Sequence, residues 1–351
     1  MRQSNSGISF IIPIYNTKSE YIKKSVESIT NQSEYQNYEV LLINDNSADI
    51  TKKYCEKICL EHDKVKLYNL KKNSGVSFAR NYGISNSKYE WIMFVDADDW
   101  IEKDAYNLLF SEIRKKSDID MYIFNTNIVM KDKVVVNKFL NTDNIDFSQI
   151  ALQIINKSSS TYCPKYNCIG VSWAKLYRKK FLINNNVKFN EGITRAEDHL
   201  FILNVISFNP IIKYVDQCVY NYRRNQFSTV NKYNSNLTNE FLKTLNEMKR
   251  IIEEKYNFDV YWDAYYIRCL SYLSSIISNK ILNKNNNNSF FKKLEEIKKL
   301  YKIDLFKEAT DKVDIKNLSN KYKILILLKK CPIILALLYK VSSTKKNKNM
   351  E

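Results

Sequence analysis

The first hundred residues alternate short apolar runs with stretches of helical spacing, and this alternation limits the fold more than any other feature. The runs are rich in β-branched and aromatic residues, as strands are. They are ISFIIPI (8–14), YEVLLIND (38–45), VKLYNL (65–70) and EWIMFVD (90–96). Between them, segments such as YIKKSVESI (21–29) repeat apolar residues at the helical period. The sequence therefore predicts an α/β fold, with a mostly parallel sheet flanked by helices.

The rest of the chain changes character twice. From 119 to 220 the pattern is mixed, with strands predicted at 120–129 and 133–140 and helices at 147–157 and 197–208. From about 235 it is helical, broken by NKNNNNSF (283–290), which we expect to be an exposed loop because it contains little apolar area to bury. The predicted division is a domain at 1–230 with halves 8–118 and 119–230, a helical domain at 231–320, and a basic tail at 321–351.

Charge and cysteine content narrow the classes of protein. The 351 residues carry a net charge of +17, and residues 231–351 alone hold 24 basic and 13 acidic residues. No zinc-finger spacing or aromatic RNA-binding motif accompanies this charge, so we expect no nucleic-acid partner. The seven cysteines are scattered. Cys163 and Cys168 come nearest to a pair of zinc ligands, but no second pair follows at zinc-site spacing, so the cysteines are typical of reduced thiols in a cytoplasmic protein. MRQSNSG leads directly into a predicted strand, so no signal peptide is expected.

Polar residues follow each of the first four predicted strands. They are Tyr15 and Asn16, Asp45, Asn73 to Gly75, and Asp96 to Asp99. Ligands of open parallel sheets bind at the carboxyl ends of the strands, so these residues are expected to lie together. Helix capping explains one carboxylate in such a loop, but FVDADDW (94–100) has three.

Asp96 and Asp98 can form an incomplete metal site. Mg²⁺ or Mn²⁺ takes one or two protein carboxylates and completes its ligands with phosphate oxygens and water. Taken alone, the acidic segment is also compatible with a solvated turn or a calcium site. Asp96 and Asp98 alternate in sequence, so they point to different sides of the backbone unless the strand has already turned.

Several motifs together resemble a known family. ISFIIPIYN, LLINDNSAD, NSGVSFARN and WIMFVDADDW, in this order and spacing, resemble the nucleotide-binding half of the inverting family 2 glycosyltransferases of the GT-A fold. SWAKLYRKKFL (172–182), VKFNEG (187–192) and TRAEDHLF (194–201) are similar to the acceptor half of the bacterial capsule and lipopolysaccharide transferases in that family. The resemblance covers about residues 8–225.

The resemblance implies roles for the donor-side residues. Pro13, Tyr15 and Asn16 would line the nucleotide pocket, and Asp45 would bond the base, typically uracil. Asn73, Gly75 and Arg80 would shape the flank of the pocket. Asp96 would contact the ribose beside Ala97, and Asp98, with Asp96, would hold a divalent metal on the diphosphate. Asp99 is as well explained by packing or capping as by contact with the donor.

On the acceptor side, Asp198 matches the family's catalytic base, next to Glu197. Both are also typical first-turn acids of the helix that follows, and the two roles are compatible. His199 is interpreted as an acceptor-site or helix-surface residue. Trp173 could stack on the acceptor and Lys175 could present its charge to it. For Trp173, a place in the core is an equally good explanation, because a tryptophan in an apolar segment is often buried.

Two positions depart from the family pattern. Asn46 replaces the usual glycine of the second motif, and Ala196 replaces the glycine before the Glu-Asp pair. Both changes affect backbone freedom rather than chemistry.

The resemblance implies a metal-dependent inverting hexosyltransferase that moves a sugar from a nucleotide-sugar, typically a UDP-sugar, to a hydroxyl of a growing capsule, lipopolysaccharide or other glycan. The acceptor would be lipid-linked, at the inner face of the cytoplasmic membrane. The alternatives are a non-catalytic scaffold that binds sugar nucleotides and a nucleic-acid-binding protein that uses the basic C-terminal region. The apolar tail with its lysines suits either membrane association or packing on its own domain. Donor sugar, linkage and oligomeric state do not follow from the sequence.

Overall fold

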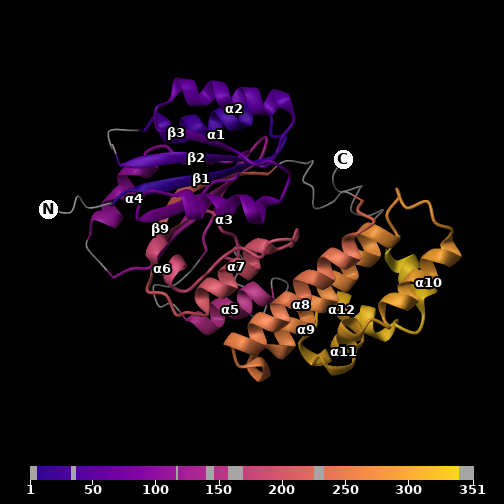
Figure 1. Cartoon of the computed structure of the whole chain (residues 1–351). Coiled ribbons are helices and arrows are strands. Elements are labelled where there is room, and N and C mark those ends of the chain that lie inside the picture. Colours follow the sequence, from indigo (N-terminus) through magenta and orange to yellow (C-terminus); the bar gives the residue numbers. More distant parts are fainter. Residues whose placement is uncertain are drawn as a thin grey trace. The chain divides into compact units, whose positions relative to one another are not determined.

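The computed structural model describes residues 6–32, 37–115, 118–139, 146–156, 169–224 and 233–339. The chain divides into two compact units, Met1–Ala151 with Tyr166–Asn225, and Leu152–Lys165 with Gln226–Glu351 (Figure 1). The first unit contains the sheet, and the second is helical. The division falls near the predicted boundary after residue 230, but the second unit also takes in 152–165. Cys163 and Cys168 lie outside the described residues.

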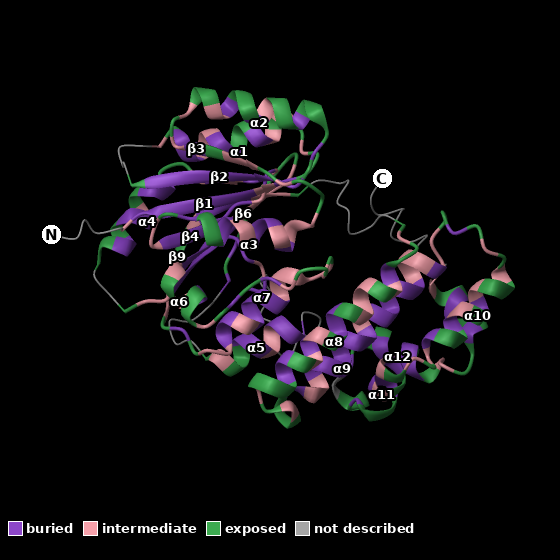
Figure 2. Ribbon diagram, viewed as in Figure 1, coloured by how far each residue is buried: buried purple, intermediate pink, exposed green. Residues whose placement is uncertain are grey.

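One half of the sheet is built from repeated strand–helix units. Its strands are β1 (Ile8–Ile14), β2 (Tyr38–Asn44), β3 (Val65–Asn69) and β4 (Trp91–Phe94), all parallel, in the order β3-β2-β1-β4. They are connected by α1 (Ser19–Thr30), α2 (Asp49–Glu61) and α3 (Val76–Asn86). β1, β2 and β4 are buried along nearly their whole length, as strands covered on both faces are (Figure 2). These predicted strands and helices are confirmed.

The other half of the sheet is mixed, so the whole is a mixed sheet flanked by helices, in agreement with the predicted α/β fold. It continues from β4 through β8 (Lys175–Arg178), β6 (Met121–Val129), β9 (Ile212–Arg223) and β5 (Trp100–Ile101), and β7 (Val134–Asn137) pairs with β6. Only β6 and β9 are parallel here; the pairs β4–β8, β6–β8, β5–β9 and β6–β7 are antiparallel among the described residues. Antiparallel neighbours need no crossover helix, so short strands can join the sheet without the periodic helices that the first half requires.

The remaining helices of the described first unit confirm two predictions. They are α4 (Ala105–Arg114), α5 (Phe147–Ile155), which runs into the second unit, α6 (Lys179–Asn184) and α7 (Glu197–Ile206). α5 and α7 correspond to the predicted helices at 147–157 and 197–208.

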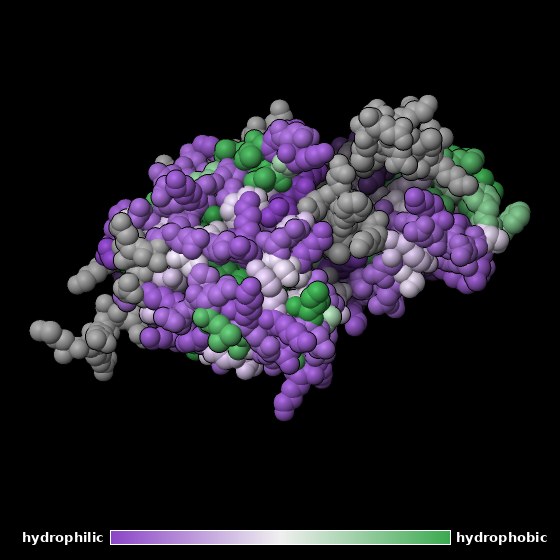
Figure 3. Space-filling model, turned by 90° about the horizontal axis from the view of Figure 1, so that it is seen from above, coloured by the Kyte–Doolittle hydropathy of each residue, from purple (hydrophilic) through white to green (hydrophobic). Residues whose placement is uncertain are grey.

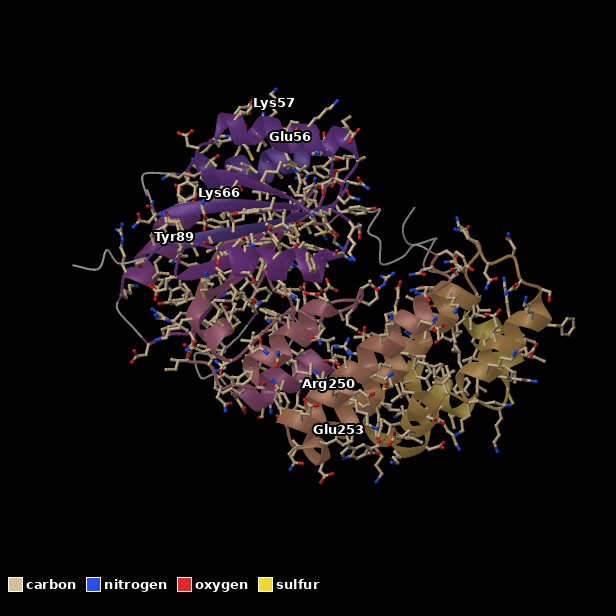
Figure 4. The ribbon with its side chains drawn as sticks, viewed as in Figure 1. Glu56, Lys57, Lys66, Tyr89, Arg250 and Glu253 are labelled. Atoms are coloured by element: carbon tan, nitrogen blue, oxygen red, sulfur yellow. The ribbon has the colours of Figure 1, made fainter. Side chains whose placement is uncertain are left out.

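A buried carboxylate joins the strands at the end of the sheet where β1 begins. Glu39 in β2 accepts hydrogen bonds from Ser9 Oγ at 2.8 Å and from Lys66 Nζ at 2.9 Å. It also accepts from the backbone N–H of Lys88, and the N–H of Tyr89 donates to Ser9 Oγ at 3.1 Å. Figure 4 labels Lys66 and Tyr89 on this side of the sheet. The charge of Glu39 is thus fully compensated although only 3% of the residue is exposed.

The second unit is organised around α9, which contacts α8, α11 and α12. Its described elements are α8 (Leu237–Lys255), α9 (Phe258–Ile276), the π-helical turn η2 (Ile277–Ile281), α10 (Phe290–Leu300), α11 (Asp304–Lys312), the 3-10 turn η3 (Ile315–Asn317) and α12 (Asn320–Leu327). Arg268, a buried cation of α9, donates to the carbonyl oxygens of Ile154 and Ile155. These carbonyls end α5 without partners in the helix, so Arg268 binds the end of α5 to α9 within the second unit.

Residues 283–289 of the predicted asparagine-rich loop form a loop that is not wholly exposed, and Phe290 begins α10. Asn286 is 6% exposed, and its side-chain amide donates to the carbonyl oxygens of Lys280 and Ile281. Ser289 caps α10 by accepting from the N–H of Lys292. Side-chain hydrogen bonds to the backbone therefore order this loop where apolar burial does not.

No described helix combines the length and the apolar character that crossing a bilayer requires. Of the predicted tail at 321–351, residues 340–351 lie outside the described residues, and residues 332–339 form a short helix.

Gly83 provides a test of how closely α3 packs on the sheet. A Cβ built at Gly83 would lie 2.4 Å from Cγ2 of Ile11 in β1. We expect Gly83→Ala to lower the free energy of unfolding by about 1–3 kcal/mol, because a packed core absorbs an added methyl group only by moving its neighbours. Urea unfolding followed by circular dichroism measures this. Ser85→Ala, at an exposed position of the same helix, is the control. Equal stability of the two variants would contradict the close contact.

Candidate active site

The loops that follow β1 and β2 are joined by direct hydrogen bonds. The N–H of Asn16 donates to Ser47 Oγ at 3.0 Å, and Asn16 Oδ1 accepts from the N–H of Ala48 at 2.8 Å. Asn16 and Asn46 both have left-handed backbones, with φ of 49° and 58°. Asparagine tolerates this region better than most residues, which explains how Asn46 replaces the family's glycine.

Asp45, at the end of β2, holds the loop that precedes α3. Its two carboxylate oxygens accept from the N–H groups of Ser74 and Gly75 at 2.7 and 2.8 Å. Gly75 has φ of +87°, which glycine adopts without strain. Contact of Asp45 with a base stays a prediction; in the structure its carboxylate fixes the flank of the predicted pocket.

The other predicted donor-side residues differ in exposure. Tyr15 is 55% exposed and Asn73 is exposed, whereas Pro13 is partly buried and Ala97 is 6% exposed. Tyr15 and Asn73 are thus accessible to a ligand at the carboxyl ends of the strands, while Pro13 and Ala97 belong mainly to the framework.

The acidic segment after β4 is a turn and not an extended strand. β4 ends at Phe94, and the N–H of Asp99 donates to the carbonyl oxygen of Asp96 at 3.0 Å. The alternation of Asp96 and Asp98 across an extended backbone therefore does not apply.

Asp99 holds this turn against β9. It is 1% exposed and accepts from Tyr220 Oη at 2.8 Å and from the N–H of Arg223 at 2.7 Å. Tyr220 Oη also accepts from the N–H of Asp96, and Arg223 Nε donates to the carbonyl oxygen of Asp98. Burial, followed by the neighbouring Asp96 and Asp98, raises the pKa of Asp99 well above its usual range. Of the two roles considered for Asp99, these bonds favour packing.

Sequence reasoning missed Tyr220 and Arg223. They lie more than 120 residues from the acids that they contact, in a strand whose apolar pattern is interrupted by polar residues. Their positions in the sequence carry no signal that pairs them with the turn.

Arg80 joins acids from two distant segments. From α3 its Nη1 donates to Asp198 Oδ1 at 2.7 Å and lies 3.5 Å from Glu197 Oε1, and its Nη2 donates to Asp96 Oδ1 at 2.9 Å. The guanidinium is 5.1 Å from the centre of the Phe189 ring, and Arg80 is 3% exposed. Burial alone would lower the pKa of Arg80, but the three carboxylates outweigh it and raise the pKa, so the cation is permanent.

The two acids at the start of α7, Glu197 and Asp198, both have raised pKa values. Burial, followed by repulsion from Asp198, raises the pKa of Glu197 to about 7, although Arg80 opposes both effects. Burial also raises the pKa of Asp198, and Arg80 again opposes the shift. A carboxyl whose pKa lies near neutral pH, as that of Glu197 does, is suited to exchange protons with a substrate.

Ala196 begins α7 with a left-handed backbone, φ 54°. At this position the family carries glycine, and alanine adopts the same conformation at a cost of about 1–2 kcal/mol. Replacing the family's glycine by Ala196 therefore keeps the backbone conformation of the motif but raises the free energy needed to adopt it.

Asp96 and Asp98 fit an incomplete metal site. Burial, followed by repulsion from the nearby Asp96 carboxylate, raises the pKa of Asp98. No described group of three or more histidine, cysteine or acidic side chains could hold a metal by itself. One or two carboxylates are the protein share of a Mg²⁺ or Mn²⁺ site that phosphates complete.

Two of the residues considered for the acceptor side are buried. Trp173 is 5% exposed and stacks on the rings of Tyr220 and Tyr222, with centroids 4.8 and 5.4 Å apart. Lys175 has no exposed surface; its ammonium donates to the carbonyl oxygen of Val171 at 2.8 Å and lies 4.4 Å from the Phe139 ring centre.

The expectation that Lys175 presents its charge to an acceptor is therefore wrong for this structure, because that charge is turned into the interior. For Trp173 the stacking supports the core role. His199 is partly buried with its ring against Gly170, where a Cβ would lie 2.6 Å from His199 Cδ2.

Comparisons with known proteins agree with this architecture. Residues 9–179 match the family described as Glycosyl transferase family 2. EpsH of Bacillus subtilis is 24% identical over 336 residues, which are 93% of this chain and 92% of EpsH. The poly(ribitol-phosphate) beta-N-acetylglucosaminyltransferase TarP of Staphylococcus aureus is 26% identical over 255 residues, 70% of this chain and 72% of TarP.

The solved structures that match include S. aureus TarS. Residues 1–349 of TarS in complex with UDP-GlcNAc superpose with a TM-score of 0.61 at 18% identity, covering 97% of this chain and 92% of that chain. Against a longer TarS chain the share of that chain is 54%. This likeness confirms the predicted GT-A fold, and with the family match and the relatives above, the chain is a glycosyltransferase whose residues 9–179 match glycosyl transferase family 2.

Proposed function

We propose that this glycosyltransferase moves a hexose-type sugar from a UDP-sugar to a hydroxyl of a growing surface glycan, with inversion at the anomeric carbon and with a divalent metal. The observation that carries the proposal is that Arg80 bonds both Asp96, after β4, and Asp198, at the start of α7. A residue expected at the donor and the expected base thus share one buried cation.

The donor lies across the carboxyl ends of β1 to β4 in this proposal. Tyr15, Asn16 and Asp45 receive the nucleoside, and Asp96 receives the ribose. Asp98 and Asp96 hold the metal, which when bound neutralises charge on the diphosphate leaving group. The TarS complex contains UDP-GlcNAc and TarP is named as an N-acetylglucosaminyltransferase, so UDP-GlcNAc is the first donor to test.

Transfer is a single displacement. The acceptor oxygen forms a bond to the anomeric carbon, the bond from that carbon to the diphosphate oxygen breaks, and Asp198 takes the hydroxyl proton. Arg80 keeps Asp198 oriented and ionised, because its cation lowers the pKa that burial raises. Glu197, beside it, adds negative charge that makes the pair a stronger base.

The acceptor is a cell-surface glycan such as a capsule, lipopolysaccharide or teichoic-acid chain, and it is lipid-linked at the cytoplasmic face of the membrane. The relatives' names support this class: one is a minor teichoic acid biosynthesis protein, and TarP acts on poly(ribitol-phosphate). In this proposal His199, at the start of α7, contributes to the acceptor side of the site.

The first prediction concerns the donor and the metal. UDP-GlcNAc with Mn²⁺ should raise the Tm, since ligand at a hundred times its Kd stabilises a protein by about 2.7 kcal/mol. Asp98→Asn should lose the part of the increase that depends on Mn²⁺, and Asp63→Asn, at an exposed loop position, should keep it. A Tm increase that is independent of Mn²⁺ in the wild type would exclude the metal; GDP-, CMP- and dTDP-sugars run in parallel test the choice of UDP.

The second prediction concerns the base. Asp198→Asn should lower kcat by about 10²- to 10⁴-fold, as loss of a general base does, while donor binding by thermal shift persists. Asp304→Asn is the matched control, because Asp304 is also a first-turn acid, at the start of α11. Release of UDP from donor and acceptor measures the rate. Undiminished transfer by Asp198→Asn would remove Asp198 from the mechanism.

The third prediction concerns Arg80 and pH. A protonated Asp198 cannot accept a proton, so kcat/KM should fall as the pH drops, and the fall should begin above the usual range of an aspartate because burial raises the pKa of Asp198. Protonation of Glu197, whose pKa is raised to about 7, should contribute to the same decline. Arg80→Gln removes the cation that lowers both pKa values, so this decline should move to higher pH. Arg80→Lys keeps one charge and should lie between. Unshifted profiles in both variants, in protein with normal circular dichroism, would limit Arg80 to a packing role.

A further inference from the structure

The last described helix, residues 332–339, is apolar on both of its faces. Leu335 and Ala336 are fully buried, and Tyr339 Oη lies 2.6 Å from Ser274 Oγ of α9. One face of this helix is therefore fixed to the second unit.

The opposite face is apolar and exposed. Ile333, Ile334, Leu337 and Leu338 are 54%, 50%, 52% and 45% exposed. Their spacing of i, i+1, i+4 and i+5 places them on one side of a helix. We call these four residues the outer face. A helix on a soluble surface normally carries polar residues there, and Figure 3 shows a largely hydrophilic surface with hydrophobic residues in separate groups.

The neighbouring sequence is basic. Residues 315–339 contain five lysines and no acidic residue. Lys321 and Lys330 are exposed, and Lys329 pairs with Asp311 of α11 at 2.7 Å. The preceding helix α12 also exposes Ile324 and Leu327, at 41% and 72%. Large apolar side chains and exposed cations thus occur on the same short stretch of chain.

We propose that the outer face docks on the surface of an anionic lipid bilayer. The four aliphatic side chains enter the boundary between headgroups and acyl chains, and the lysines contact lipid phosphates. No described helix can span the bilayer, so the contact is interfacial. This inference uses only the C-terminal helices and does not depend on the transfer chemistry.

A second copy of the chain fits the outer face less well. Four half-exposed side chains fall far short of the roughly 800 Å² that each partner buries in a standard interface. A two-fold contact there would also bring the lysines of both copies together, because each residue of such an interface faces its symmetry-related surface. An anionic leaflet complements the same charge.

Vesicle flotation of the full chain tests the proposal. Vesicles of phosphatidylcholine mixed with phosphatidylglycerol should bind the protein about tenfold better than phosphatidylcholine alone. The double variant Ile334→Ser with Leu337→Ser should lose this binding by about tenfold, and Ile50→Ser with Leu60→Ser, equally apolar and exposed on α2, should keep it. Lys321→Gln with Lys330→Gln should weaken binding only to the anionic vesicles, whereas Lys52→Gln with Lys53→Gln should not.

Three outcomes would overturn the proposal. The first is that the wild-type protein does not bind anionic vesicles. The second is that the Ile334→Ser, Leu337→Ser variant binds them as well as the wild type does. The third is that the wild type sediments as a dimer and this variant as a monomer, which would make the outer face a contact between copies. Donor turnover with a soluble acceptor is measured on the same variants. Normal turnover in a variant that no longer floats separates failure of membrane docking from failure of the proposed reaction.

Discussion

The buried guanidinium of Arg80 is the interaction on which the site depends. Asp96, Glu197 and Asp198 come from two segments a hundred residues apart, and removing any of these charges from water is costly without a counterion. A planar guanidinium reaches several carboxylates from one position, which a lysine ammonium on a flexible stem does less well. Arg80 reaches them because Gly83, one turn later in α3, lets the helix lie directly on Ile11 of β1.

A second set of bonds, made by β9, keeps the acidic turn in place. Asp99 gives up contact with solvent to bind Tyr220 and the backbone of Arg223, and the Tyr220 hydroxyl links Asp99 to the N–H of Asp96. Of the three acids in FVDADDW, Asp99 is therefore structural and Asp96 is bound to Arg80, while Asp98 is the acid that we propose as a metal ligand. The close spacing of three carboxylates is explained by this division of roles.

The sequence predicts the parts of the molecule that repeat or that follow a motif. The four parallel strands, their helices and α7 were predictable because period and burial agree along each of them. β8 was not, because a short antiparallel strand leaves little periodic signal. β9 was not, because polar residues interrupt its apolar pattern. Lys175 was misplaced for a related reason: a lysine is assumed to be exposed, and only the fold supplies the carbonyl oxygen and aromatic ring that compensate its charge in the interior. Arg80 was identified by its motif, but its three partners required the structure.

The loops of the candidate site contain several non-glycine residues with left-handed backbone conformations. Asn16 and Asn46 adopt left-handed conformations in the loops after β1 and β2, and Ala196 does so directly before Glu197. An alanine in this region persists only if its surroundings hold it there. For Ala196 those surroundings are the ion pairs that the next two residues make with Arg80. The strained alanine directs the first turn of α7 toward the guanidinium, and the ion pairs in turn stabilise the strained residue, so a loss of Arg80 would release both.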